Sequence, residues 1–234
     1  MNLHAIPNFV AAILILIAGL FVALQNRKAK TNFVFFLLTF AAFIWQGGTG
    51  LALLAKNPAL ALISTRIAFF GIALIPVFSY HLTLYVLEAN INKILIFGYI
   101  FALLCFIPLS WTPLILNGVN TYPWGFFFKA GRLHPVFMVF FIYFMILIFS
   151  ILFLSYRKEQ SHLEKNRKKY FLVALVIAYI GTVDYLPTYG LRVYPFGYLT
   201  LICFVLIFAY AIIRHQLMEI EVIIKKSLVF AGMF

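Results

Sequence analysis

Seven long apolar runs occupy most of this 234-residue chain. A helix needs about 20 apolar residues to cross a bilayer core of about 30 Å, and each run is close to that length. The runs show no alternation of apolar and polar residues and are about twice as long as a barrel strand. The sequence therefore predicts an all-α integral membrane protein, a bundle of seven transmembrane helices. The predicted spans are 5–24, 33–54, 62–87, 94–110, 135–155, 170–187 and 196–213.

Composition and charge support this class. Hydrophobic residues make up 65% of the chain and charged residues 10%, against about 45–50% and about 25% in soluble domains. The formal net charge is +12, and most of the excess lies beside apolar runs. We therefore expect anionic membrane lipids, and not nucleic acid, to be the counterpart of this charge. Cys105 and Cys203 lie in separate runs and are predicted to be packing residues, with no metal site and no cofactor.

The distribution of lysine and arginine predicts the orientation. With the N-terminus outside, 13 of the 18 lysine and arginine residues fall in inner segments, where multi-pass proteins carry this excess. The leader Met1–Asn8 has no lysine or arginine, so the first run is predicted to be a true span and not a signal peptide. We expect one transmembrane domain, residues 1–213, with its C-terminal end in the cytoplasm.

Residues 214–234 are predicted to form a cytoplasmic juxtamembrane segment. Apolar residues recur there at helical spacing, which leaves two interpretations open. The segment is either a short interfacial helix anchored by basic residues, or the start of a signalling helix that forms a homodimer and transmits motion. The apolar stretch 228–234 has no polar terminus, so we expect the helix to be cut from a longer chain. The candidate output residues are Arg214, His215, Leu217, Ile220 and Ile224.

Polar residues inside membrane spans are energetically expensive, so each is a functional hypothesis. Arg66 and Asp184 are predicted to lie at matching depths in the third and sixth spans, where they can pair. That pair is either structural or the polar floor of an outward-facing pocket. His81 is expected to be a hydrogen-bonded packing residue and not a ligand or proton relay. The glycine-rich segment 47–50 permits close helix approach or a kink. The candidates for a ligand pocket or interhelical polar cluster are Arg66, Asp184, Tyr185, Trp45, Gln46, Tyr80 and His81.

The longest outer connection, residues 111–134, is rich in aromatic residues, proline and glycine. Aromatic side chains at this depth commonly form an interfacial belt. So many in one connection also suit an extracellular lid over a pocket, and both interpretations stay open. The candidate lid residues are Trp111, Tyr122, Trp124 and Phe127.

Common catalytic motifs are missing from the sequence. The chain has no H-E-x-x-H zinc motif, no G-x-S-x-G nucleophile elbow and no glycine-rich phosphate loop. The seventh run has no lysine that could hold retinal. We therefore expect the chain not to be an enzyme by itself. A small transporter or channel stays an alternative, although inverted repeats and paired broken helices are not visible.

Four segments resemble the N-terminal seven-transmembrane region of bacterial sensor histidine kinases. The resemblance covers nearly the whole chain in the right order. It implies a sensor followed by cytoplasmic GAF, PAS or histidine kinase modules in cis, and none of these modules lies in the present sequence. The segments are 66–71 (RIAFFG), 123–135 (PWGFFFKAGRLHP), 184–190 (DYLPTYG) and 210–220 (YAIIRHQLMEI).

Together these patterns predict a sensor or signal-input domain of a bacterial two-component system in the cytoplasmic membrane. A small or lipophilic ligand, or a membrane property, is expected to act near Arg66 and Asp184 and to shift the helices toward the tail. The competing interpretations are a small transporter or channel, and a passive membrane anchor for an output domain.

Overall fold

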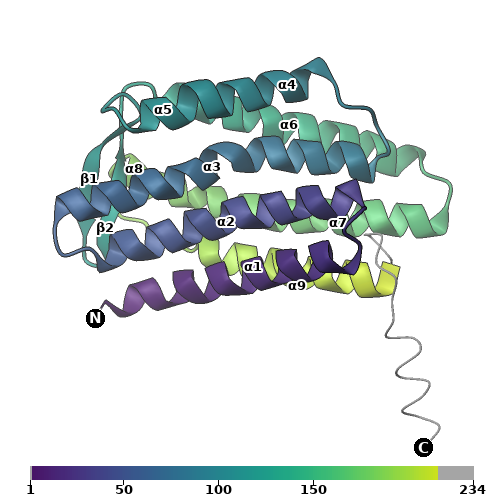
Figure 1. The fold of residues 1–234 in the computed structure, drawn as a ribbon, viewed down its shortest axis with the longest axis horizontal. Coiled ribbons are helices and arrows are strands. Elements are labelled where there is room, and N and C mark those ends of the chain that lie inside the picture. The colour runs from purple at the N-terminus through teal and green to yellow at the C-terminus, as the bar shows by residue number, and fades with distance from the viewer. Residues whose placement is uncertain (1, 216–234) are drawn as a thin grey trace, which may run out of the picture.

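The computed structural model describes residues 2–215, with side chains to Ala211, and shows long helices with a β-hairpin across one end (Figure 1). This end is named the hairpin end; the turns from α1 to α2, from α3 to α4 and from α6 to α7 lie at the opposite end. The long elements are α1 (Ile6–Gln25), α2 (Lys30–Leu54), α3 (Pro58–Val86), α4 (Lys93–Ile100), β1 (Leu116–Tyr122), β2 (Gly125–Ala130), α6 (His134–Lys158), α7 (His162–Ile180) and α9 (Gly197–His215). The short elements are a 3-10 turn (Leu3–Ala5), a π-helix (Phe101–Phe106), α5 (Ile107–Ser110), a 3-10 turn (Gly181–Asp184) and α8 (Tyr185–Thr188).

Six helical segments in the described part of the chain are long and apolar enough to cross a membrane. They coincide with the first six predicted runs. The seventh run coincides with α9, an apolar helix whose side chains are described over Gly197–Ala211. Apolar side chains such as Ile17, Leu104 and Val139 are more than half exposed on the outside of the bundle, as lipid-facing residues should be. The chain is therefore a multi-pass membrane protein, and its seventh crossing stays a prediction.

Six helices form a closed ring around the core. Along the ring, α1 contacts α2, α2 contacts α3, α3 contacts α6, α6 contacts α7, α7 contacts α9, and α9 contacts α1. The fourth span lies outside the ring, where α4 packs against α3. Its π-helix reaches α6 through Phe106, whose ring centroid lies 5.3 Å from that of Phe137 and 4.9 Å from that of Phe140. The space inside the ring is thus enclosed by α1, α2, α3, α6, α7 and α9.

Small residues bring α2 and α3 into close contact. A Cβ atom added at Gly71 would lie 2.1 Å from the backbone oxygen of Ala41, and one added at Gly48 would lie 2.7 Å from the backbone nitrogen of Ala68. No side chain larger than hydrogen fits at either position without moving a helix. The close approach predicted for segment 47–50 is confirmed at Gly48, whereas a Cβ atom at Gly47 would meet nothing within 4 Å.

A β-hairpin stands where an irregular connection was expected, so the all-α prediction is wrong for residues 116–130. The strands β1 and β2 pair antiparallel, with Tyr122 opposite Gly125 and Val119 opposite Phe128. The aromatic run 126–128 favours a pleated strand. Gly125 has φ 128°, a conformation that suits glycine after the turn. The hairpin packs on α2, α3 and α8 and covers this end of the bundle (Figure 1).

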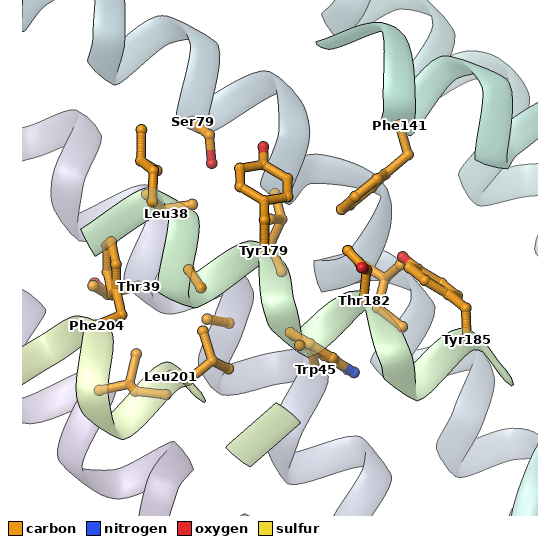
Figure 2. Close-up of a pocket in the computed structure, with 17 residues that line it drawn as sticks. Leu38, Thr39, Trp45, Ser79, Phe141, Tyr179, Thr182, Tyr185, Leu201 and Phe204 are labelled. Carbon is orange, nitrogen blue, oxygen red and sulfur yellow. The ribbon is translucent and has the colours of Figure 1, made fainter. Parts of the chain in front are cut away.

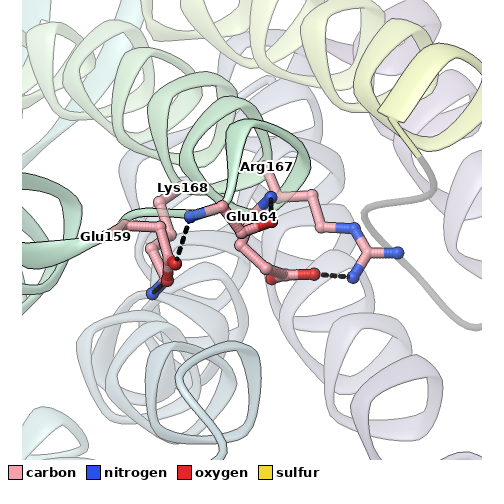
Figure 3. Close-up of polar contacts among 5 residues, drawn as sticks. Glu159, Glu164, Arg167 and Lys168 are labelled. Atoms are coloured by element: carbon pink, nitrogen blue, oxygen red, sulfur yellow. Dashed lines mark hydrogen bonds and ion pairs between the residues drawn. The ribbon is translucent and has the colours of Figure 1, made fainter.

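Two ion pairs organise the turn between α6 and α7 at the opposite end (Figure 3). Lys168 Nζ lies 2.5 Å from Glu159 Oε2, and Arg167 pairs with Glu164. The hydrogen bond from Lys168 lowers the pKa of the Glu159 carboxyl below its ordinary value. The helix α7 begins at His162, well before the predicted run at 170. The apolar pattern did not show its first turns, because they are basic and polar.

A residue with left-handed backbone ends α3 and gives a stability prediction. Glu88 has φ 52°, and the Ala89 N–H donates to the Leu84 carbonyl oxygen at 2.8 Å, as in helices that end in glycine. A side chain in this conformation costs about 1–2 kcal/mol, and a carboxylate is unfavourable at a helix C-terminus. We expect Glu88→Gly to raise the free energy of unfolding by about 1 kcal/mol, measured by thermal unfolding in detergent micelles. Glu88→Ala keeps the Cβ atom and should gain less; an equal gain would show that only the charge matters.

Candidate functional site

A cavity of about 60 Å³ lies at the centre of the helix ring (Figure 2). Every ring helix contributes to its wall, together with α8. Leu38 and Trp45 come from α2, Phe141 from α6, and Leu201 and Phe204 from α9. Because Leu201 and Phe204 form part of the wall, the last described helix is in direct contact with whatever occupies the cavity.

Hydroxyl groups supply most of the polar atoms in the wall. Thr39 Oγ1 donates to the carbonyl oxygen of Phe36 at 2.9 Å, within its own helix. Tyr179 is only 8% exposed, and its hydroxyl has no hydrogen-bond partner. Ser79 lies beside this hydroxyl (Figure 2) and interacts with its oxygen only weakly, with no hydrogen bond of good geometry between them. None of the described side chains that line the cavity is an acid, a histidine, a lysine or an arginine, so the wall offers hydrogen bonds but no charge.

The helix α3 is locally weakened beside the cavity. It runs unbroken through Pro76. Proline has no N–H, so the carbonyl oxygen of Ile72 lacks its usual donor one turn later. Ile72, Ile75 and Ser79 line the cavity on either side of this position. A helix with a missing hydrogen bond bends more easily, which suits a wall that changes shape.

Asp184 anchors the start of α9 next to the cavity. Its Oδ1 accepts the N–H groups of Phe196 and Gly197 at 2.8 Å and 2.9 Å, and its Oδ2 accepts from Gly197 at 3.0 Å. The first N–H groups of a helix have no partner within the helix, and the helix dipole favours a carboxylate there. A Cβ atom at Gly197 would lie 2.3 Å from Asp184 Oδ2 and 3.4 Å from Trp45. Asp184 therefore ties the end of the sixth span to α9, with both of its oxygens accepting backbone N–H groups.

Hydrogen bonds join the hairpin to α8. The Tyr122 hydroxyl donates to the Pro187 carbonyl oxygen at 2.6 Å, and Asn120 Nδ2 donates to the same oxygen at 3.0 Å. Burial raises the pKa of the Tyr122 hydroxyl, against a smaller opposing effect of the Asn120 hydrogen bond. His134, at the start of α6, is fully buried, and its Nδ1 lies 2.8 Å from the Tyr189 hydroxyl. The hairpin, α6 and α8 thus form one packed assembly.

The turn of the hairpin is tied to the N-terminus. Asn2 Nδ2 donates to the carbonyl oxygens of Leu53 at 2.8 Å and Trp124 at 2.7 Å. The Trp124 ring stacks on Tyr122 with centroids 4.7 Å apart, and Phe127 is buried. Three of the four predicted lid residues, Tyr122, Trp124 and Phe127, therefore belong to a packed cap at the hairpin end. Opening of this cap as a lid stays a prediction.

The predicted ion pair between Arg66 and Asp184 is wrong. The Arg66 guanidinium carbon lies 5.6 Å from the ring centre of Trp111, and its Nε is buried without a hydrogen-bond partner. Trp111, the fourth predicted lid residue, is 52% exposed and lies at the surface beside the half-buried Arg66. Matching depth does not decide which face of a helix a side chain occupies. The ion pairs found among residues 2–211 are those of the α6–α7 turn.

Tyr80 and His81 belong to a separate polar cluster nearer the opposite end. Asn92 Nδ2 donates to the Tyr80 hydroxyl at 2.7 Å, and His81 Nδ1 lies 2.7 Å from the Tyr99 hydroxyl. Asn92 lies in the turn before the fourth span and Tyr99 lies in that span, so both are outside the helix ring. This placement fits the expected packing role of His81.

Of the seven candidate pocket residues, Trp45 and Tyr185 line the cavity, and Asp184 lies beside it. Gln46 is buried, and its Oε1 has no hydrogen-bond partner in the described part of the chain. Sequence reasoning missed Tyr179 and Ser79. Their only sequence signal is a hydroxyl inside an apolar run, which does not show whether the side chain faces lipid or the ring.

The candidate output residues lie at the limit of the described chain. The backbone of α9 continues to His215, so Arg214 and His215 extend the helix. Their side-chain contacts, and Leu217, Ile220 and Ile224, lie outside the described residues.

Comparison with known proteins gives one family. The family model described as the N-terminal 7TM region of histidine kinase matches residues 7–221 of the chain. The match includes the helices from α1 to α9, except the first residue of α1, and all residues that line the cavity. No curated protein matches the chain. Within the described residues, no group of three His, Cys, Asp or Glu side chains could hold a metal ion.

Proposed function

Because the chain belongs to the family of N-terminal seven-transmembrane regions of histidine kinases, we propose that it is the sensor input domain of a bacterial signalling protein. Its output is a histidine kinase in the cytoplasm, and the input domain itself carries out no chemistry. The main observation in support of this proposal is the central cavity, whose wall includes every helix of the ring, among them α9, the helix that leads toward the C-terminus.

The proposed topology has seven spans, the hairpin end outside and the opposite end in the cytoplasm. In residues 2–215, eleven lysine and arginine residues lie toward the opposite end and five toward the hairpin end. The positive-inside rule supports this orientation. It directs α9 toward the cytoplasm, where an output domain would receive it. The eleven are Arg27, Lys28, Lys30, Lys93, Arg157, Lys158, Lys165, Arg167, Lys168, Lys169 and Arg214.

The proposed mechanism is a shift of α9 driven from the cavity. A stimulus moves the equilibrium between two packings of the ring only by its differential affinity for them. At its hairpin end α9 is held by Asp184, and further along it contributes Leu201 and Phe204 to the cavity wall. Pressure on these two side chains would therefore displace the C-terminal part of α9 more than the end that Asp184 anchors. Helix shifts of about 1–2 Å are typical of such transitions.

Kinase activity of a membrane-bound fusion tests this proposal. Residues 1–234 are joined to a histidine kinase core, and autophosphorylation is measured in inverted membrane vesicles. Ala42 lines the cavity, so Ala42→Leu fills part of it and is expected to change the rate by about 5-fold or more. Gly47→Leu is the matched control, because a side chain there meets open space on the same helix. If both variants match the unsubstituted fusion at equal membrane content, the chain is a passive anchor.

A further inference from the structure

We propose that the central cavity binds a small uncharged molecule with a mainly hydrocarbon body and one hydrogen-bond acceptor oxygen, which the Tyr179 hydroxyl receives. This inference deepens the proposed function and rests on it for its biological meaning, since it names the chemical class that the sensor takes. The binding itself is a property of residues 2–211 and can be tested without a kinase.

The wall of the cavity excludes an ionised ligand. Its side chains are mostly aliphatic and aromatic, such as Leu38, Ile72 and Leu175, and none of the described ones carries a charge. The nearby acidic group, Asp184, already accepts the N–H groups of Phe196 and Gly197 at the start of α9. A charge placed in such surroundings without a partner is strongly disfavoured. The ligand must therefore be neutral.

The Tyr179 hydroxyl is a buried hydrogen-bond donor without an acceptor. The side chain is more than nine-tenths buried, and its oxygen has no hydrogen-bond partner. A buried donor without a partner is rare and destabilising in a folded protein. The neighbouring Thr39 hydroxyl is different, because its proton goes to backbone carbonyl oxygens of α2. The unused donor of Tyr179 is thus the feature that selects a carbonyl, ether or alcohol oxygen.

Water fits the cavity less well than a neutral amphiphile. A buried water usually makes about three hydrogen bonds. The wall offers the unpaired Tyr179 hydroxyl, while most of the surrounding surface is hydrocarbon. A molecule with one oxygen and an apolar body satisfies the donor and also buries its hydrocarbon part. This match between wall and ligand favours an amphiphile.

The size of the cavity connects binding to signalling. A volume of about 60 Å³ is less than half of the roughly 150 Å³ that holds benzene in an apolar protein cavity. Benzene has six non-hydrogen atoms, so on this scale a ligand of about two or three non-hydrogen atoms occupies the ring as described. A longer one, including both ketones used below, enters only if the wall moves outward. Phe204 and Leu201 of α9 are part of that wall. A ligand with a longer hydrocarbon body should consequently displace α9, whereas a short one should only occupy the cavity.

Equilibrium dialysis tests the ligand class. The full chain is purified in detergent micelles and dialysed against isotope-labelled butan-2-one, hexan-2-one and hexanoate. We expect saturable binding of at least one ketone and none of hexanoate. Binding measured with Ala42→Leu, which fills part of the cavity, is subtracted to correct for partition of the ketones into the micelle. Tyr179→Phe should weaken ketone binding by about 3- to 10-fold, whereas Tyr143→Phe, an exposed tyrosine on α6, should leave it unchanged.

Several outcomes would overturn the inference. These are equal ketone binding by the protein and Ala42→Leu, equal binding by the protein and Tyr179→Phe, or tighter binding of hexanoate than of the ketones. Thermal unfolding of each variant shows whether it is folded. If Tyr179→Phe is unfolded, the hexanoate comparison in the unsubstituted protein still decides.

The kinase fusion separates this inference from the proposed function. Ketone binding that depends on Tyr179, together with a fusion insensitive to Ala42→Leu, would support the binding site and reject the sensor. A fusion that responds to Ala42→Leu without any ketone binding would support the sensor and reject the ligand class. A lipid-derived ligand is distinguished from a diffusible one by extraction of the purified chain. A retained neutral amphiphile that is lost in Ala42→Leu indicates a membrane source.

Discussion

Replacing Gly197 by alanine is expected to lower the free energy of unfolding by about 2–4 kcal/mol. The new Cβ atom would lie 2.3 Å from Asp184 Oδ2, so the carboxylate must leave the start of α9. Its departure strands the N–H groups of Phe196 and Gly197, which the carboxylate now satisfies. Buried donors without partners account for most of the expected loss. Thermal and denaturant unfolding in detergent micelles measure the change.

Gly47→Ala is the matched control for this substitution. Gly47 also lies in a membrane helix, but a Cβ atom there meets nothing within 4 Å. Its replacement should leave stability unchanged or raise it by up to about 1 kcal/mol, because alanine favours the helix. Asp184→Ala should resemble Gly197→Ala, since both remove the same hydrogen bonds. Full stability of both variants would show that Asp184 does not anchor α9.

Gly71→Ala is expected to lower the free energy of unfolding by a similar amount, about 2–4 kcal/mol. The added Cβ atom would lie 2.1 Å from the carbonyl oxygen of Ala41 and 3.0 Å from the Trp45 backbone nitrogen. Both neighbours are backbone atoms of α2, so no side-chain rotation relieves the overlap. The helices α2 and α3 must separate and lose contact area along their length. Unfolding midpoints in detergent check the result.

A second pair of helices supplies the contrast for Gly71→Ala. A Cβ atom at Gly19 would lie 1.9 Å from Oγ1 of Thr39, which is a side-chain atom. Trimming that neighbour with Thr39→Ala removes this contact but keeps the Thr39 Cβ atom at 2.9 Å, so it should restore part of the stability lost in Gly19→Ala. The double variant Gly71→Ala/Ala41→Gly should stay destabilised, because the overlap is with the main chain. Equal rescue in both cases would contradict the close backbone packing of α2 on α3.

The helices were predictable because apolar runs of about 20 residues have few alternatives in a membrane. Six of the predicted spans appear as apolar helices, and α9 occupies the seventh. The hairpin was not predictable from the same signal, since the run 126–128 suits an aromatic belt as well as a strand. The run forms a strand because it pairs with residues 116–122. Such pairing depends on contacts that a single sequence does not display.

The site was predictable only in part. The depth of a residue follows from counting along a span, and this placed Asp184 correctly near the hairpin end. The face of the helix does not follow from depth, and so Arg66 was assigned to Asp184 although it lies against Trp111. Gly197 gave no sequence signal of its role, because its importance comes from a carboxylate thirteen residues earlier. Tyr179 was likewise hidden in an apolar run.

The most direct test of the sensor proposal measures the position of α9. Spin labels are attached at Phe33→Cys on α2 and Leu206→Cys on α9, both exposed positions, after Cys105 and Cys203 are replaced by alanine. Distances from double electron–electron resonance are compared between Ala42→Leu and Gly47→Leu. If the cavity controls α9, Ala42→Leu should shift the mean distance by about 1–2 Å relative to Gly47→Leu. Identical distance distributions in two folded variants would contradict the account.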